Sequence, residues 1–554
     1  MPTLQFKGKN IIWNHHLSIP YYTLDELEKL HYNPNKSDGN IIIEGDNLLA
    51  LKSLLPLYSG RIKCIYIDPP YNTGNEKWIY NDNVNSPLIK DWLGKEINKE
   101  DLTRHDKWLC MMVPRLKLLR ELLTDDGVIL ISIDDNEKDR LRLIMDEIFS
   151  EDCFIANITV ENDSRTRQYD AIGVTHEYVL IYSKTECFNY NILQDEDKEF
   201  QYEDSDGGFD IYELRNRNVS FNKSNRPNLY YPFWVNPNNP DKDGFYKISL
   251  EETKGWVKTY PQESQGIKTV WRWGRDTAKK NLNAVLFARK HSDGFFQIIK
   301  KYRGASYSLN SVWTDKEIKT DRGTLEIKSL FDNKKVFDYP KPIALIKRLL
   351  SVFSDDDSLI LDSFGGSGTT MHAVMDLNKE DGKNRKCILV QMTEATESEP
   401  NKNICKDITR ERIKRAIKKY AYDSGFEYFK IGTPIDAENL LSGKLPTFKQ
   451  FAEYVYYLFT GENIKDKSII NEKTFLVGEH NNAVIYLIYN QNFEKLTKLA
   501  LNLPIAENII NDNPKKRIII YAPACFLEED YMKEKNIEFV GIPYNLFRRE
   551  NGVD

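Results

Sequence analysis

Residues 61–71, Arg-Ile-Lys-Cys-Ile-Tyr-Ile-Asp-Pro-Pro-Tyr, decide how the rest of the chain is interpreted. The first seven are mostly apolar, with several isoleucines, which is typical of a buried strand. Pro69 and Pro70 cannot continue a central strand because proline has no backbone N–H to donate. The stretch therefore predicts a buried strand that ends abruptly in a turn carrying Asp68 and Tyr71.

Similar apolar segments recur along the chain and alternate with segments of helical periodicity. They are apolar on both faces, which is typical of a parallel sheet covered by helices on two sides. The predicted strands are 40–46, 61–67, 128–133, 176–182, 358–361 and 386–391, and the predicted helices are 47–57, 107–123, 140–149, 340–350 and 408–420. The pattern indicates an α/β fold.

A glycine-rich segment, Phe364-Gly-Gly-Ser-Gly-Thr369, follows the predicted strand 358–361. Glycines let the backbone turn tightly and approach a ligand, and the next helix offers free N–H groups. The lysine of a phosphate-binding loop is missing, whereas the carboxylate and backbone of an amino acid would fit. By itself the segment is equally well explained as a simple strand-to-helix turn.

Asp68 to Tyr71 suit a reaction at the amine of a nucleobase. This nitrogen is a poor nucleophile because its lone pair is delocalised into the ring. The Asp68 carboxylate and the Pro69 carbonyl could hold its hydrogens, while Tyr71 stacks on a base that has left the duplex. A solvent-facing turn is the alternative interpretation. Asp68 and Asp362 are 294 positions apart, yet each ends a strand of one presumed sheet, where such folds bind ligands.

The composition narrows the class of protein. Apolar residues make up 41% and charged residues 29% of 554, which is typical of a globular chain of about two to four domains. The sequence shows neither a signal layout nor an apolar run near the roughly 18 residues that span a bilayer, so we expect a cytoplasmic protein with no membrane partner. The seven cysteines are scattered singly, and no third ligand stands at a fitting distance in sequence from His15-His16. The sequence therefore indicates no metal site.

The two motifs together resemble the catalytic and cofactor motifs of amino-methyltransferases. The catalytic motif comes first, as in the permuted β class. Further segments resemble the modification (Mod) subunit of type III restriction-modification systems, and the set covers about half of the chain. These segments are 44–51, 65–74, 114–119, 125–137, His176-Glu-Tyr178 and Tyr339-Pro-Lys-Pro342.

The resemblance implies a role for each matching residue. Asp68, Pro69, Pro70 and Tyr71 would hold the target base. The methionine end of S-adenosylmethionine would lie against Asp362, Phe364, Gly365, Gly366 and Gly368. Asp46 would sit near the cofactor's adenine, and Lys341 would begin the helix that flanks the cofactor. Many relatives carry an acidic residue for the ribose hydroxyls where this chain has Gln391, so either Gln391 or Glu394 would make that contact.

Residues 185–330 differ from the flanking segments and are predicted to be an inserted domain. Within the net charge of −6, residues 251–330 carry 16 lysines and arginines against 9 acidic residues. In the family this place is taken by the segment that recognises the DNA sequence, which makes Trp256, Arg272 and Arg275 candidates for DNA contacts. A core role is the alternative for the tryptophans, and is favoured for Trp271 and Trp273.

The sequence thus predicts a Rossmann-like methyltransferase sheet, permuted, with an inserted target-recognition domain and a small C-terminal α/β domain. The expected parts are 1–39, 40–184 (catalytic half), 185–330 (insert), 331–430 (cofactor half) and 440–554. The expected activity is methylation of adenine N6 in duplex DNA with S-adenosylmethionine, by a homodimer that pairs with a restriction subunit. Cytosine-N4 methylation, RNA methylation and a catalytically idle DNA-binding subunit are the alternatives.

Overall fold

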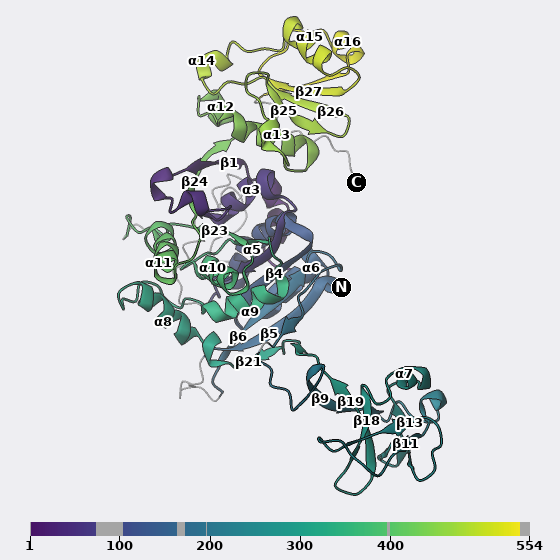
Figure 1. Cartoon of the computed structure of the whole chain (residues 1–554). Helices are drawn as coiled ribbons and strands as arrows, with labels where there is room; N and C mark the ends of the chain where they lie inside the picture. Colours follow the sequence, from purple (N-terminus) through teal and green to yellow (C-terminus); the bar gives the residue numbers. More distant parts are fainter. Residues whose placement is uncertain (1, 74–102, 163–171, 196, 396–398, 543–554) are drawn as a thin grey trace. The chain divides into compact units, whose positions relative to one another are not determined.

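The computed structural model describes residues 2–73, 103–162, 172–195, 197–395 and 399–542. These residues form two compact units (Figure 1). The first unit consists of Met1–Asn191 and Leu309–Asp554, and the second of Ile192–Ser308.

A ten-stranded sheet forms the centre of the first unit, in the order β1-β24-β2-β23-β22-β3-β4-β6-β5-β21. The strands in this order are Tyr21–Glu26, Glu427–Ile435, Ile41–Glu44, Lys386–Gln391, Leu359–Asp362, Ile62–Ile67, Leu123–Ile133, His176–Ser183, Phe154–Glu161 and Val312–Trp313. The six strands from β24 to β4 are parallel. β6 runs antiparallel to β4, and β1 runs antiparallel to β24. The sheet is therefore mixed, and the expectation that strand 176–182 is parallel was wrong.

Strands from distant parts of the sequence are neighbours at the middle of this sheet. β22 pairs in parallel with β3, with Ile360 opposite Cys64 and Leu361 opposite Ile65. β23 flanks β22 on its other side. The carboxyl ends of β3 and β22 therefore lie at one edge of the sheet, which brings the two sequence motifs together.

Helices cover both faces of the sheet, because its central strands are apolar on both sides (Figure 1). In β4, Ile129 and Ile131 face one core, and Val128 and Leu130 face the other. The first core includes α3 (Asn47–Tyr58), α5 (Arg104–Leu122) and α6 (Lys138–Phe149). The second includes α8 (Thr320–Leu330), α9 (Ile343–Phe353), α10 (Thr369–Asp381) and α11 (Glu411–Tyr420).

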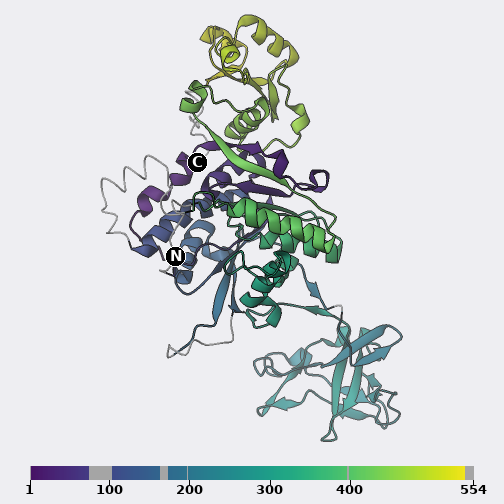
Figure 2. The ribbon, with the colours of Figure 1, turned by 90° about the vertical axis from the view of Figure 1, so that its left-hand side faces the viewer.

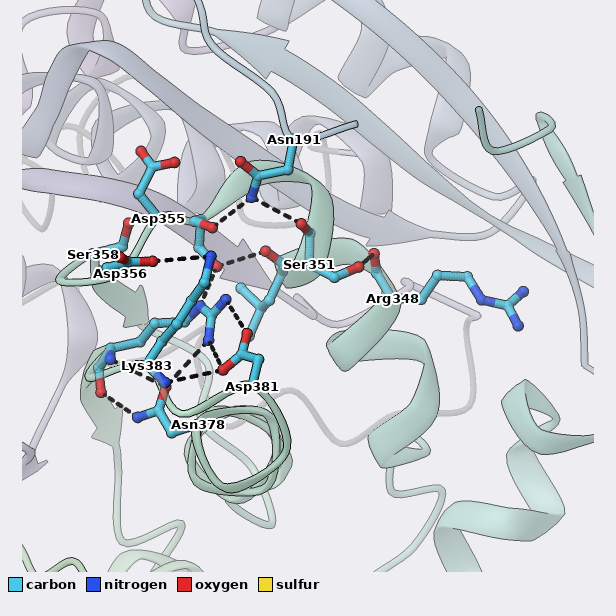
Figure 3. Close-up of polar contacts among 12 residues, drawn as sticks. Asn191, Arg348, Ser351, Asp355, Asp356, Ser358, Asn378, Asp381 and Lys383 are labelled. Carbon is cyan, nitrogen blue, oxygen red and sulfur yellow. Dashed lines mark hydrogen bonds and ion pairs between the residues drawn. The ribbon is translucent and has the colours of Figure 1, made fainter. Parts of the chain in front are cut away.

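The C-terminal end of α9 is fixed by a polar network (Figure 3). Asn191 Nδ2 donates to the carbonyl oxygens of Ser351 and Ser354, at 3.0 and 2.8 Å. The buried Arg385 donates to Ser354 Oγ at 2.8 Å and to both carboxylate oxygens of Asp381, in α10, at 3.0 and 2.8 Å. These bonds satisfy carbonyls that a helix end leaves without partners, and they tie α9 to α10.

The C-terminal part of the first unit contains a second, four-stranded sheet, in the order β25-β26-β27-β28. Its strands are Leu476–His480, Ala483–Leu487, Arg517–Ala522 and Ile537–Gly541. Helix α13 (Phe448–Thr460) packs against β1, where the rings of Tyr454 and Tyr21 lie 4.7 Å apart. This part therefore shares an apolar core with the large sheet.

The second unit is built largely of β-strands (Figure 2). It has its own core around Phe233, Trp271 and Ile298. A five-stranded sheet has the order β12-β18-β19-β9-β8. Its strands in this order are Phe245–Tyr246, Leu286–Lys290, Phe296–Tyr302, Gly207–Glu213 and Tyr202–Asp204. A three-stranded sheet, β13-β11-β14, contains β13 (Ile248–Ser249), β11 (Phe233–Val235) and β14 (Val257–Thr259).

The second unit is shorter than the expected insert 185–330. Residues 309–330 belong to the first unit, because β21 pairs with β5 and because Trp313, Ile327 and Leu330 are buried in the core beneath α9. This boundary was not recognisable in the sequence, since β21 has few apolar residues.

None of the helices in the described ranges is long and apolar enough to cross a membrane.

Candidate active site

The Asp-Pro-Pro-Tyr turn leaves the sheet directly after β3, whose six residues are all buried. The Trp108 side chain, from α5, is fully buried, and its indole N–H donates to the Pro70 carbonyl at 2.7 Å. Within the described ranges, no hydrogen bond from a loop or a side chain reaches the Pro69 carbonyl. Two prolines and one buried indole thus fix the turn and leave the Pro69 carbonyl available.

The glycine-rich segment follows β22 and is shaped by Asp362. One Asp362 carboxylate oxygen accepts from the Phe364 N–H at 2.9 Å, and the other accepts from the Thr370 hydroxyl at 2.5 Å. Burial raises the pKa of Asp362 to about 7. Gly366 and Gly368 have φ values of +49° and +83°, a backbone conformation that residues with a side chain rarely adopt. These positions therefore favour glycine, and within the segment Gly366 is partly exposed while Gly365 and Gly368 are buried.

Asp46 and its neighbours support the glycine-rich segment from α3. The Asn47 amide donates to the Ser363 carbonyl at 2.9 Å and accepts from Arg115 Nε at 2.6 Å. Arg115 also lies 3.6 Å from Asp46, whose carboxylate accepts the Leu48 N–H at the start of α3. Asp46 thus lies near the segment, where it also caps a helix.

Gln391 ends β23 and contacts the glycine-rich segment directly. Its side-chain oxygen accepts from the Gly366 N–H at 2.7 Å, and its side-chain nitrogen donates to Glu394 at 3.0 Å. Burial raises the pKa of Glu394, which is held near Lys402.

A pocket of about 280 Å³ lies next to this region, and its lining includes Phe337, Lys402, Asn403 and Asp407. The Phe337 ring also lies against Gly366.

A cluster of four side chains joins the catalytic motif to Lys341. The Lys341 ammonium lies 2.5 Å from Glu177 Oε2, 2.5 Å from the Tyr71 hydroxyl and 3.5 Å from Asp68 Oδ1. The Tyr71 hydroxyl donates to Glu177 at 2.9 Å. Lys341 was expected only to begin the helix beside the cofactor, but its side chain points into the catalytic motif. Glu177 was not predicted as a site residue, although it is the middle residue of the matching His176-Glu-Tyr178 segment.

The charges in this cluster alter one another's protonation. Burial raises the pKa of Asp68 to about 6, while the nearby Lys341 ammonium opposes that increase. Burial alone would lower the pKa of Lys341, but the Asp68 and Glu177 carboxylates raise it above its usual value. Lys341 is therefore a cation and Asp68 is largely a carboxylate at neutral pH. A carboxylate at this position can accept hydrogen bonds from an amine.

The predicted DNA-contact residues lie in the second unit. Arg272 and Arg275 are exposed, and Arg275 Nη2 donates to the Leu250 carbonyl at 2.8 Å, while Trp256 is half-buried. The interpretation of Trp271 as a core residue is confirmed, since it is 2% exposed, and Trp273 packs against the same core.

The described residues contain no group of three or more His, Cys, Asp or Glu side chains that could hold a metal ion.

Comparisons with known proteins agree with this geometry. A family described as DNA methylase matches residues 62–419, which include both motifs. The chain is 34% identical to the type II methyltransferase M.KpnI of Klebsiella pneumoniae, over 78% of this chain and 94% of that protein. It is 32% identical to the EcoPI Mod subunit, a type III restriction-modification enzyme subunit of Escherichia phage P1, over 73% of this chain and 66% of that protein.

A third relative is the StyLTI Mod subunit of Salmonella typhimurium, 31% identical over 72% of this chain and 61% of that protein. The chain thus spans about two thirds of the length of these two Mod subunits. The family match includes both sequence motifs, and the M.KpnI match covers nearly all of that relative. The chain belongs to the DNA methylase family.

Proposed function

We propose that this protein is a site-specific DNA methyltransferase that transfers a methyl group from S-adenosylmethionine to adenine N6 in duplex DNA. One observation carries the proposal: the Asp68 turn and the glycine-rich segment end the adjacent parallel strands β3 and β22. A base held by the turn and a methyl donor held by the segment would therefore meet at one edge of the sheet.

The Asp-Pro-Pro-Tyr turn would hold the adenine after the base has left the duplex. The Asp68 carboxylate and the available Pro69 carbonyl would accept the two amine hydrogens, and Tyr71 would stack on the ring. S-adenosylmethionine, when bound, supplies an electrophilic methyl group. As the nitrogen–carbon bond forms and the carbon–sulfur bond breaks, the amine loses one proton, which Asp68 can accept because its pKa is raised to about 6.

The glycine-rich segment fits an amino-acid ligand, because Gly365, Gly366 and Gly368 present only backbone. A side-chain atom on Gly365 would come within 3.2 Å of the Val390 carbonyl, so a larger residue would crowd β23. Phe364 and Asp362 complete this end of the site. For the ribose hydroxyls, we favour Glu394, because its carboxylate has two oxygens that can accept from hydroxyls, whereas the one side-chain oxygen of Gln391 accepts the Gly366 N–H.

The second unit would read the DNA, and one of its faces suits nucleic acid. We call this face the lysine–aromatic strip; it consists of Lys223, Tyr230, Trp234, Lys258 and Tyr260. The Tyr230 and Tyr260 rings stack with centroids 5.0 Å apart. Lys258 pairs across β11 and β14 with Trp234, while Phe233 and Val235 point into the core. Lysines can bind phosphates and the rings can stack on bases or sugars.

Lysines lie over the rings along the whole strip. The Lys223 ammonium is 4.9 Å from the Tyr230 ring centre, and the Lys258 ammonium is 5.2 Å from that of Trp234. Trp256, two residues before Lys258, lies next to the strip in sequence. Arg272 and Arg275 remain proposed DNA contacts. Each guanidinium donates one hydrogen bond to a carbonyl, Arg272 to that of Arg215 at 3.4 Å and Arg275 to that of Leu250 at 2.8 Å.

The relatives suggest the biological setting. Two of them are Mod subunits of type III restriction-modification enzymes. We therefore propose that the chain works in the cytoplasm as a modification subunit, forms a homodimer and pairs with a restriction subunit. Size-exclusion chromatography with light scattering on the purified chain would test the dimer.

The function is tested by single-molecule sequencing of DNA from cells that express the wild-type chain, Asp68→Ala or Asp139→Ala. Asp139 is the control, because its side chain is 85% exposed on α6 and it has no part in the proposed reaction. We expect one sequence motif to carry N6-methyladenine with the wild type and the control, and to lose it with Asp68→Ala. N4-methylcytosine in its place, or no modification with any chain, would contradict the proposal.

A further inference from the structure

The cluster around Lys341 links elements that are far apart in the sequence. Asp68 and Tyr71 follow β3, Glu177 lies in β6, and Lys341 precedes α9. Lys341 is 8% exposed and Glu177 is 3% exposed, so both charges are withdrawn from water. A charge is buried at such a position only when a partner compensates the cost of desolvation.

The backbone of Lys341 is fixed as tightly as its side chain. The Lys341 carbonyl accepts from the Thr369 hydroxyl at 3.2 Å, which ties it to the end of the glycine-rich segment. Two residues later, the Ile343 N–H donates to Glu326 at 3.0 Å. The network at Ser354 and Arg385 fixes the other end of α9. Lys341 is therefore held from two sides, which fixes the position of its ammonium group.

Other ionisable groups also face this cluster. Tyr66, in β3, donates to or accepts from Ser132 and lies near both Asp68 and Glu177. Asp134, which follows β4, interacts electrostatically with Glu177. Asp362, at the end of β22, interacts electrostatically with Asp68. Burial raises the pKa of Tyr66, so this hydroxyl is neutral, whereas Asp134 and Asp362 are further carboxyl groups beside the cluster.

We propose that Lys341 and Glu177 act as a pair of positioning residues for methyl transfer: Lys341 keeps Asp68 ionised and holds the Tyr71 hydroxyl, and Glu177 holds Lys341 in place. This inference rests on the proposed function. The pair would set Asp68 and Tyr71 before the base arrives, which lowers the ordering cost of binding. Two carboxylates and one ammonium also leave one negative charge, which complements the positive charge of the methyl donor.

The two residues should influence Asp68 in opposite directions. Without the Lys341 ammonium, the Asp68 carboxylate loses a stabilising neighbour, so the pKa of Asp68 rises. Without the Glu177 charge, Asp68 loses a repelling neighbour, so its pKa falls. Damage to the fold alone would not produce opposite shifts. The double variant, which removes both charges, should have an intermediate value.

The test measures the titration of Asp68 directly by ¹³C NMR of protein labelled at the aspartate side-chain carboxyl carbons. The Asp68 signal is assigned as the one missing in Asp68→Asn. We expect Lys341→Met to raise its pKa by about one unit and Glu177→Gln to lower it by a similar amount. Lys347→Met is the matched control, because Lys347 lies on α9 and pairs with Asp376 at 2.6 Å, outside the cluster. It should leave the Asp68 titration unchanged.

The second readout is kcat for methylation of a duplex oligonucleotide, measured from pH 5 to 9 with both substrates saturating. The acid limb should move to higher pH in Lys341→Met and to lower pH in Glu177→Gln. Saturation with S-adenosylmethionine separates this effect from titration of Asp362 beside the glycine-rich segment. Thermal unfolding at each pH identifies any variant that is not folded, and Glu177→Gln, which only removes a charge, is the variant expected to tolerate the whole range.

Shifts in the same direction, or no shift in folded variants, would overturn the positioning role. If the wild-type chain methylates no DNA while the opposite NMR shifts are present, the proposed function fails and the effect of the pair on Asp68 stands. If methylation is normal and the NMR shifts are absent, the function stands and the pair is rejected.

Discussion

At the scale of the residue, Gly368 makes the sharpest prediction about cofactor binding. Gly368 and Gly382 lie at the two ends of α10, with φ values of +83° and +71°. A side chain at Gly368 would meet the Thr409 carbonyl at 3.2 Å, whereas one at Gly382 would meet nothing within 4 Å. Both Gly→Ala variants should lose about 1–2 kcal/mol of unfolding free energy from backbone strain. Only Gly368→Ala should also weaken S-adenosylmethionine binding, as measured by calorimetry, and equal loss of affinity in both would argue against a cofactor site at this segment.

Single residues also show what sequence alone can predict about the site. Asp68 and the glycine-rich segment were predictable, because their conformations depend on prolines and glycines that impose local geometry. Glu177 was not, because a carboxylate at the start of a strand gives no sign of which distant cation it will meet. Lys341 was predicted beside the cofactor, and only its contacts in the folded chain, with Asp68 after β3 and Glu177 in β6, show that its ammonium points at Asp68.

At the scale of the element, apolar patterning predicted the central strands and helices well. It could not predict direction, because a strand buried on both faces has the same pattern in parallel and antiparallel pairs; β6 is the example. It also missed β21, since two residues carry too little periodicity to be recognised. Long-range pairing decided both cases.

The anchoring of α9 is an element-scale property that stability measurements can test (Figure 3). Arg385→Met removes a buried guanidinium together with its hydrogen bonds to Ser354 and Asp381. We expect a loss of about 3 kcal/mol of unfolding free energy, measured by urea denaturation. Lys383→Met is the control, because Lys383 pairs with an Asp356 side chain that is 78% exposed. Such exposed pairs contribute about 0–1 kcal/mol. Equal effects of the two variants would show that the network does not hold α9.

At the scale of the whole molecule, the proposed function places methyl transfer and DNA reading in different compact units, which makes the two separable by mutation. The double variant Lys223→Ala/Lys258→Ala removes both cations of the lysine–aromatic strip without touching the first unit. We expect it to weaken binding of a duplex and to reduce the slope of log K against log salt by about two, because each phosphate contact contributes about 0.9. Affinity for S-adenosylmethionine should not change.

The matched control for the strip is Lys279→Ala/Lys280→Ala, which removes two exposed lysines from α7 (Arg275–Lys280) of the same unit. Equal loss of charge makes the two double variants comparable, so any difference between them reports the face that meets the duplex. If the α7 variant changes the salt slope and the strip variant does not, then DNA lies along α7 and Arg275, and the strip has another role. If the strip variant alone changes it, the stacked rings of Tyr230 and Tyr260 become the place to look for base contacts.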